Sequence, residues 1–170
     1  SGGVTSTVFA ESFDLHPALL GLVIGSLFIT QGMAQIPGGV LLDRYGPRLS
    51  LAFGSMIAAA GCLIVALASR WELLLLGRML IGLGYAPVRM GSMAFLLNWV
   101  GRARVSLDTG RLLVVGMIGG VVATAPLARA MAAQGWRIVY AELAALTLLL
   151  GLAGYVILRD QPPVAAGAAT

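Results

Sequence analysis

Long apolar runs, each about as long as a membrane-crossing helix, constrain this chain more than any other feature of its sequence. A helix rises about 1.5 Å per residue, so roughly 20 apolar residues cross a hydrocarbon core of about 30 Å. Five runs reach that length, at residues 17–42, 49–69, 73–97, 109–131 and 138–158. The breaks between them are short, so neighbouring helices must run antiparallel. We therefore predict an all-α, polytopic transmembrane helix bundle.

The composition agrees with lipid around the surface. Only 11% of the 170 residues are charged and 59% are hydrophobic, whereas a soluble domain carries about 25% charged residues. The basic residues, all Arg, are spread between the apolar runs instead of forming one basic surface, which argues against a nucleic-acid partner. The single Cys62 lies inside an apolar run, so no disulfide framework or metal cluster is expected.

The distribution of arginines predicts the orientation. Alternate loops lie on the same side of the membrane, and one set of loops carries six arginines: Arg44, Arg48, Arg102, Arg104, Arg111 and Arg159. The other set carries three, so the positive-inside rule places the richer set in the cytoplasm. The expected location is a bacterial inner membrane, with the C-terminal tail cytoplasmic.

The two ends of the chain suggest a piece of a longer protein. Residues 1–10 are small and moderately apolar and are predicted to be the tail of a preceding helix, which would make six. Residues 1–160 then form the helical bundle, and residues 161–170, rich in Pro, Ala and Gly, form a cytoplasmic linker or tail. The chain starts at Ser1 with no secretory signal, so we expect a fragment of a longer chain.

A tight turn separates the first two runs. Gly46 suits a helix end that needs a positive φ, and Pro47 suits the first turn of the next helix. Asp43 lies at the end of the preceding helix, where a carboxylate meets the unfavourable pole of the macrodipole. We therefore expect Asp43 to be held by a nearby arginine or by the N-terminus of another helix.

This turn resembles the signature of the major facilitator superfamily, Gly-x-x-x-Asp-Arg-x-Gly-Arg-Arg. The matching residues are Gly39, Asp43, Arg44, Gly46 and Arg48. The sequence departs from the signature at Pro47, where the family often has Arg, and at the two following positions, where it often has basic residues. The resemblance implies that the turn is a conformational latch, which stabilises one state through contact with the second half of a transporter.

Two further strings resemble the same family in the order that the family requires. Arg78, Gly82 and Gly84 are similar to its fourth-helix motif, and residues 135–137 to the turn before its sixth helix. The string around Pro126 lacks the Gly-Pro-x-x-Gly-Gly of the antiporter branches, which weighs against a drug antiporter. The resemblance implies an N-terminal six-helix half without most of its first helix, with the C-terminal half as its partner.

Arginines inside a span are expensive and must face protein or water, because insertion scales put the cost at about 2.5 to 3.5 kcal/mol. Arg78, Tyr85 and Arg89 share one helical face with Gly82, and we predict that this face lines a cavity. The family implicates Arg78 in proton or substrate coupling. The alternative for both arginines is that they snorkel to an interface. If both face the cavity, they favour an anionic substrate.

Other polar residues in the spans admit two interpretations each. Gln31 and Gln35 lie one turn apart and either bind substrate or bond neighbouring helices. Glu142, the one acid inside a predicted span, either couples to protons or pairs with Arg137. On the first helix a stripe of small residues predicts close packing, against a helix of the second half in the family's fold: Gly21, Gly25, Gly32 and Gly39.

The predicted function is secondary active transport of a small solute by alternating access, coupled to an ion and with an anion favoured. The alternative is a membrane assembly or sensor protein on the same helices. An enzyme is disfavoured, because the spans lack a Ser–His pair, paired acids or a metal cluster, and no phosphate-binding loop supports an ATP-driven pump. The expected partners are the lipid bilayer, a small-molecule substrate and the C-terminal half, and no cofactor is expected.

Overall fold

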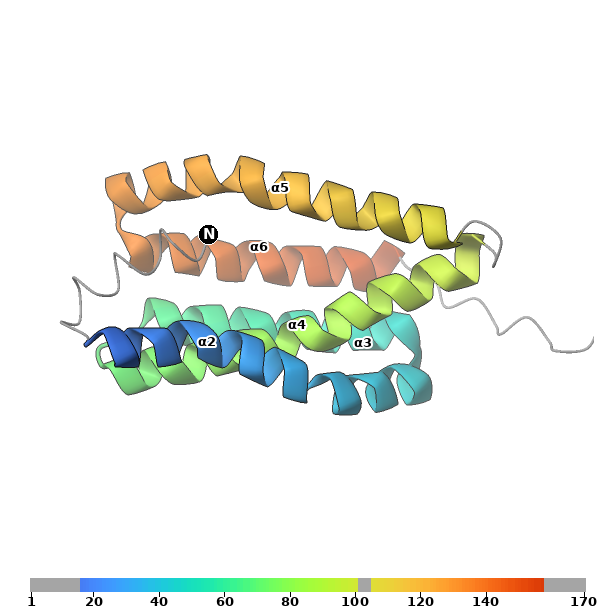
Figure 1. The fold of residues 1–170 in the computed structure, drawn as a ribbon, viewed down its shortest axis with the longest axis horizontal. Helices are drawn as coiled ribbons and strands as arrows, with labels where there is room; N and C mark the ends of the chain where they lie inside the picture. Colours follow the sequence, from blue (N-terminus) through green and yellow to red (C-terminus); the bar gives the residue numbers. More distant parts are fainter. Residues whose placement is uncertain (1–15, 101–104, 158–170) are drawn as a thin grey trace, which may run out of the picture.

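The computed structural model describes residues 16–100 and 105–157, and all regular structure in these ranges is helical. The helices are α2 (Pro17–Met33), α3 (Gln35–Ala66), α4 (Trp71–Val100), α5 (Val105–Gln134) and α6 (Trp136–Ile157). They run roughly along one axis, side by side (Figure 1). The all-α bundle is therefore confirmed. The helix tail predicted at residues 1–10 and the linker predicted at residues 161–170 lie outside the described residues.

The first predicted span is divided in the structure. α2 ends at Met33 and α3 begins at Gln35, so the prediction of one unbroken helix over residues 17–42 is wrong. The cause is Pro37, which has no N–H to donate to the carbonyl one turn earlier and whose ring crowds that carbonyl. Ala34 keeps a helical backbone (φ −74°, ψ −7°), so the two helices continue end to end with a bend (Figure 1).

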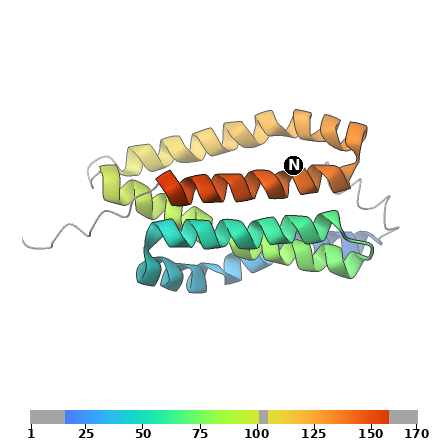
Figure 2. The same ribbon diagram turned by 180° about the vertical axis from the view of Figure 1, so that it is seen from behind.

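The predicted turn between the first two spans lies within α3. At Gly46 the backbone leaves the helix (φ 78°, ψ 170°), and Pro47 opens the next segment. The chain reverses direction here, which Figures 1 and 2 both show. The positive φ predicted for Gly46 is confirmed, and its extended ψ puts it in a region that is essentially reserved for glycine.

Four stretches are long and apolar enough to cross a membrane within the described ranges, and α2 is a shorter apolar helix. The stretches are Gln35–Ala66, Trp71–Met93, Thr109–Gln134 and Trp136–Ile157. Because α3 contains the turn at Gly46, its first arm continues α2 and its second arm is a separate crossing. The predicted antiparallel order of the spans is thus retained.

Small residues bring α3 and α4 into backbone contact. A Cβ added at Gly84 would lie 2.5 Å from the carbonyl oxygen of Gly54, and one at Gly61 would lie 2.7 Å from that of Gly77. Such close approach is the usual way that membrane helices gain packing energy. A buried apolar cluster extends from this contact to α6 and includes Val65, Leu74, Ile81, Trp136, Val139 and Ala144. The α3–α4 pair is therefore the centre of the described bundle.

α5 packs far less than the other helices. Met131 is the one residue of its membrane-length stretch, Thr109–Gln134, that is buried among the described residues. The glycines of α5 are open as well, since no atom of the described ranges lies within 4 Å of a Cβ added at Gly116, Gly119 or Gly120. In Figure 1 it runs beside α6 at the edge of the bundle, on the side away from α2 and α3.

Candidate functional site

Arg78 is buried inside the bundle. Its side chain is only 6% exposed, and Nη2 donates a hydrogen bond to the hydroxyl of Tyr140 on α6 at 3.2 Å. A cavity of about 370 Å³ adjoins it, lined also by Tyr85, Cys62 and Thr147 among mainly apolar side chains. None of the lining residues within the described part of the chain is acidic. The cavity therefore presents a guanidinium and hydroxyls to whatever enters it.

The two glycines of the fourth-helix motif, Gly82 and Gly84, allow two different helices to approach α4 closely. A Cβ at Gly82 would clash with the carbonyl of Leu27 and the hydroxyl of Thr30, both on α2. A Cβ at Gly84 would instead meet Gly54 and Ala58 of α3. Two residues advance the helix by about 200°, so the glycines face opposite sides. The motif thus lets α4 lie between α2 and α3, with Arg78 one turn before Gly82.

The predicted polar stripe on α4 is shared between two cavities. Arg89 is exposed and lines a second cavity of about 260 Å³ together with Gln31 and Gln35. The structure thus brings together one residue each from α2, α3 and α4 that the sequence had singled out separately. Arg78 and Tyr85 belong to the first cavity. Eleven residues of helix separate the two arginines, which corresponds to about 16 Å.

The signature turn contacts α6 through Arg48. Its Nε donates to the backbone carbonyl of Tyr155 at 2.6 Å, and its guanidinium carbon lies 4.2 Å from the centre of that ring. Asp43 and Arg44 are both exposed, and Arg44 lies 5.6 Å from the ring centre of Tyr45. The half-buried Gly39 completes the motif next to them. The predicted latch contact with the second half of a transporter stays a prediction.

Glu142 lies away from both cavities. It is exposed on α6, two residues after Tyr140 and hence on the opposite side of that helix. Its proposed partner Arg137 donates to the carbonyl oxygen of Ala68 at 3.1 Å and lies 4.9 Å from the ring centre of Trp136. The surroundings of Arg137 thus tie the start of α6 to the end of α3.

Tyr140 and Thr147 are the cavity residues that sequence reasoning missed. Both lie on one face of α6 with Ala144 and Gly151, at spacings of four, three and four residues. That face is buried or half-buried along its length. A phenol hydroxyl inside an apolar run needs a polar partner when buried, so the spacing around Tyr140 was the available signal.

Comparison with known proteins agrees with this arrangement. The sequence profile described as the Major Facilitator Superfamily matches residues 2–169. A probable L-galactonate transporter of Escherichia coli (strain K12) is 26% identical over 161 residues, which are 95% of this chain and 36% of that protein. The facilitated glucose transporter member 12 of solute carrier family 2 from Mus musculus is 27% identical over 140 residues, 80% of this chain and 22% of that protein.

The same fold occurs in a solved structure. The proton:xylose symporter XylE bound to 6-bromo-6-deoxy-D-glucose superposes with a TM-score of 0.69 at 20% identity, over 92% of this chain and 40% of that one. The chain thus spans well under half the length of these proteins. The matched family is one of membrane transporters, not of enzymes, which confirms the predicted class. The chain is an integral membrane protein that belongs to the Major Facilitator Superfamily.

Proposed function

We propose that this chain forms the N-terminal half of a secondary transporter that moves a small anionic solute by alternating access. The observation that carries the proposal is the buried guanidinium of Arg78, which lines a cavity whose described lining residues include no acid. A guanidinium at a cavity suits a substrate carboxylate, because the two form charge-assisted hydrogen bonds that are stronger than neutral ones.

The second cavity supports the same substrate class. Arg89 offers a guanidinium and the two glutamines offer amide donors, a set that suits a carboxylate with further hydroxyl groups. Of the relatives described above, the E. coli protein is named for a sugar acid and the mouse protein for a neutral sugar. Two arginines on one face of α4 favour the acid. We place the two cavities along one route, about half the depth of a bilayer core apart.

The C-terminal half supplies the other wall of this route in our proposal. The stripe of small residues on the first predicted span is open among the described residues, none of which comes within 4 Å of a Cβ added there: Gly21, Gly25, Gly32 and Gly39. Such a face suits a second helix at close range. We propose that the halves rock about this seam while the turn around Asp43 contacts the second half in one state.

Orientation and coupling follow from charge. We place the turn that contains Arg44 and Arg48 in the cytoplasm of a bacterial inner membrane, by the positive-inside rule. Uptake of an anion then works against a negative interior, at about 2.3 kcal/mol per charge for each 100 mV. We therefore propose that a cation is transported with it.

The test is uptake by the complete transporter in proteoliposomes, with an imposed ion gradient. We expect radiolabelled sugar acid to accumulate in the vesicles and radiolabelled glucose not to accumulate. Arg78→Gln and Arg89→Ala should each lower uptake of the sugar acid about tenfold or more, because a hydrogen bond to a charged group is worth about 1.5–3 kcal/mol. Arg129→Ala, an exposed arginine on α5 outside both cavities, is the control. Absence of flux with every anion and sugar would favour the assembly or sensor alternative.

A further inference from the structure

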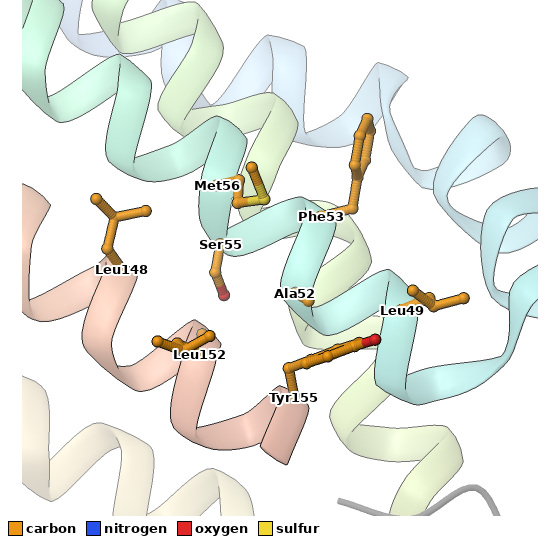
Figure 3. A pocket seen from close by; sticks show the side chains of 9 residues that line it. Leu49, Ala52, Phe53, Ser55, Met56, Leu148, Leu152 and Tyr155 are labelled. Atoms are coloured by element: carbon orange, nitrogen blue, oxygen red, sulfur yellow. The ribbon is translucent and has the colours of Figure 1, made fainter.

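An apolar groove runs between the second arm of α3 and α6 (Figure 3). It encloses about 440 Å³ and is lined by Leu49, Ala52, Phe53, Ser55, Met56, Leu148, Gly151, Leu152 and Tyr155. The helices meet at its base, where Gly151 leaves so little room that a Cβ would clash with Ser55. Leu148, Leu152 and Tyr155 project from α6 toward α3 (Figure 3). The groove is therefore a cleft between two helices in contact.

The lining offers little to a polar ligand. Two of its residues carry hydroxyls, Ser55 and Tyr155, and the hydroxyl of Ser55 already donates to the carbonyl oxygen of Leu51 at 2.8 Å. Leu49, Met56 and Leu152 are each 45–62% exposed, so the groove opens outward from the bundle. On a membrane-spanning helix such an apolar surface faces hydrocarbon. An unfilled groove would deprive its walls of dispersion contacts, so a hydrocarbon chain is the ligand that it fits.

A positive charge marks one end of the groove. Arg48 directly precedes the first lining residue of α3, and its guanidinium lies over the ring of Tyr155, the last lining residue of α6. The exposed Arg44 and Asp43 lie on the same turn, so the formal charge of the turn is +1 from two arginines and one aspartate. The described residues that line the groove include no acidic side chain. Its charged end thus favours an anion.

The length of the groove also fits its position. The lining extends over eight residues of each helix, whose ends lie about 10 Å apart, or a third of the hydrocarbon core. It starts at the turn, where the chain leaves the membrane, and continues inward. A ligand with a hydrocarbon tail in the groove therefore has its head at the depth of the lipid headgroups.

We propose that this groove is a binding site for an anionic phospholipid, with one acyl chain between α3 and α6 and the phosphate at Arg48. Arg48 then bridges the lipid headgroup and the carbonyl of Tyr155. Because Arg48 belongs to the signature turn, the lipid ties that turn to the end of α6. The groove shares no lining residue with the cavities at Arg78 and Arg89, so substitutions in it leave the described walls of the proposed substrate route unchanged.

The test is native mass spectrometry of the purified chain, released from detergent micelles after addition of phosphatidylglycerol or of phosphatidylcholine with the same acyl chains. We expect about fivefold greater retention of phosphatidylglycerol, since one basic residue near a membrane surface contributes about that factor. Arg48→Gln should remove the preference, and Ala52→Phe, which fills the groove, should lower retention of both lipids. Arg129→Gln, exposed on α5, should change neither.

Three results would overturn the proposal. Equal retention of the two lipids by the unaltered chain would show that Arg48 does not select an anionic headgroup. Competition by glycerol 3-phosphate as effective as that by phosphatidylglycerol would show a headgroup site with no acyl groove. A photoactivatable phosphatidylglycerol that crosslinks outside α3 and α6 would place the lipid elsewhere. Helicity measured by circular dichroism verifies the fold of each variant, and Ala52→Leu replaces Ala52→Phe if that variant loses helicity.

Discussion

The close approach of α3 and α4 makes Gly84→Ala a sharp test of the fold. The new methyl carbon would lie 2.5 Å from both the amide nitrogen of Ala58 and the carbonyl oxygen of Gly54, and 2.8 Å from the methyl of Ala58. Carbon atoms pack best at about 3.5 to 4.0 Å. The two nearest atoms belong to the backbone and cannot rotate away. The helices must therefore separate by about 1 Å at this point.

The cost follows from that separation. A gap of about 1 Å forfeits up to about half of each dispersion contact across the seam. Overpacking of this kind costs about 1–3 kcal/mol, while Gly→Ala in a helix interior recovers up to about 1 kcal/mol of propensity. The matched control is Gly119→Ala on α5, where no described neighbour lies within 4 Å of the new methyl, so only the gain in propensity remains. The two variants should thus differ by about 1–3 kcal/mol.

Unfolding in mixed micelles by titration with sodium dodecyl sulfate, followed by helicity, measures this difference. We expect Gly84→Ala to unfold at lower denaturant than Gly119→Ala, and Gly84→Leu at lower denaturant still, because its larger side chain needs a wider gap. Equal midpoints for the two alanine variants would refute the reasoning, since they would mean that α3 and α4 do not touch through backbone at Gly84.

Three further predictions concern the turn and the cavities. Gly46→Ala should lower the free energy of unfolding by about 1–3 kcal/mol in the same titration, because φ 78° with ψ 170° is strained for any side chain; an unchanged midpoint would contradict the turn geometry. Tyr140→Phe removes the acceptor for Arg78 and should lower kcat/KM of the complete transporter about tenfold, and full activity would exclude a role for this hydrogen bond. Gln31→Ala and Arg89→Ala should be coupled by at least about 0.5 kcal/mol in a double-mutant cycle on anion uptake, whereas additive effects would mean that they do not share a ligand.

The sequence predicts best what is decided locally. The turn at Gly46 follows from a glycine and a proline at adjacent positions, and the structure has it there. The bend at Ala34 also has a local cause, Pro37. The apolar run continues through it without a break, however, so hydrophobicity alone predicts one helix. Span lengths are set by the bilayer, so the order of the membrane crossings needed no tertiary information.

The neighbours of each face required the structure. Helical periodicity correctly places Arg78 and Gly82 one turn apart, but it does not tell which helix approaches. α2 meets α4 at Gly82. The part of the α4 stripe around Arg78 and Tyr85 therefore opens into one cavity, and Arg89 opens into another. The bond from Arg78 to Tyr140 joins residues 62 positions apart in the chain. A contact that distant depends on how whole helices pack, which the spacing of residues within one helix does not specify.

The bend at Ala34 divides the first membrane crossing into two helical arms. An amide at position 37 would lock the arms together by donating to the carbonyl of Met33, and a proline there leaves that bond unformed. On either side of the bend the N–H of Ala34 donates to the carbonyl of Thr30 at 2.9 Å, and the N–H of Gly38 donates to the carbonyl of Ala34 at 2.8 Å. Gln31 lies on one arm next to the bend, and the turn at Gly46 ends the other arm. A change in the angle at Pro37 would therefore move the turn relative to the second cavity.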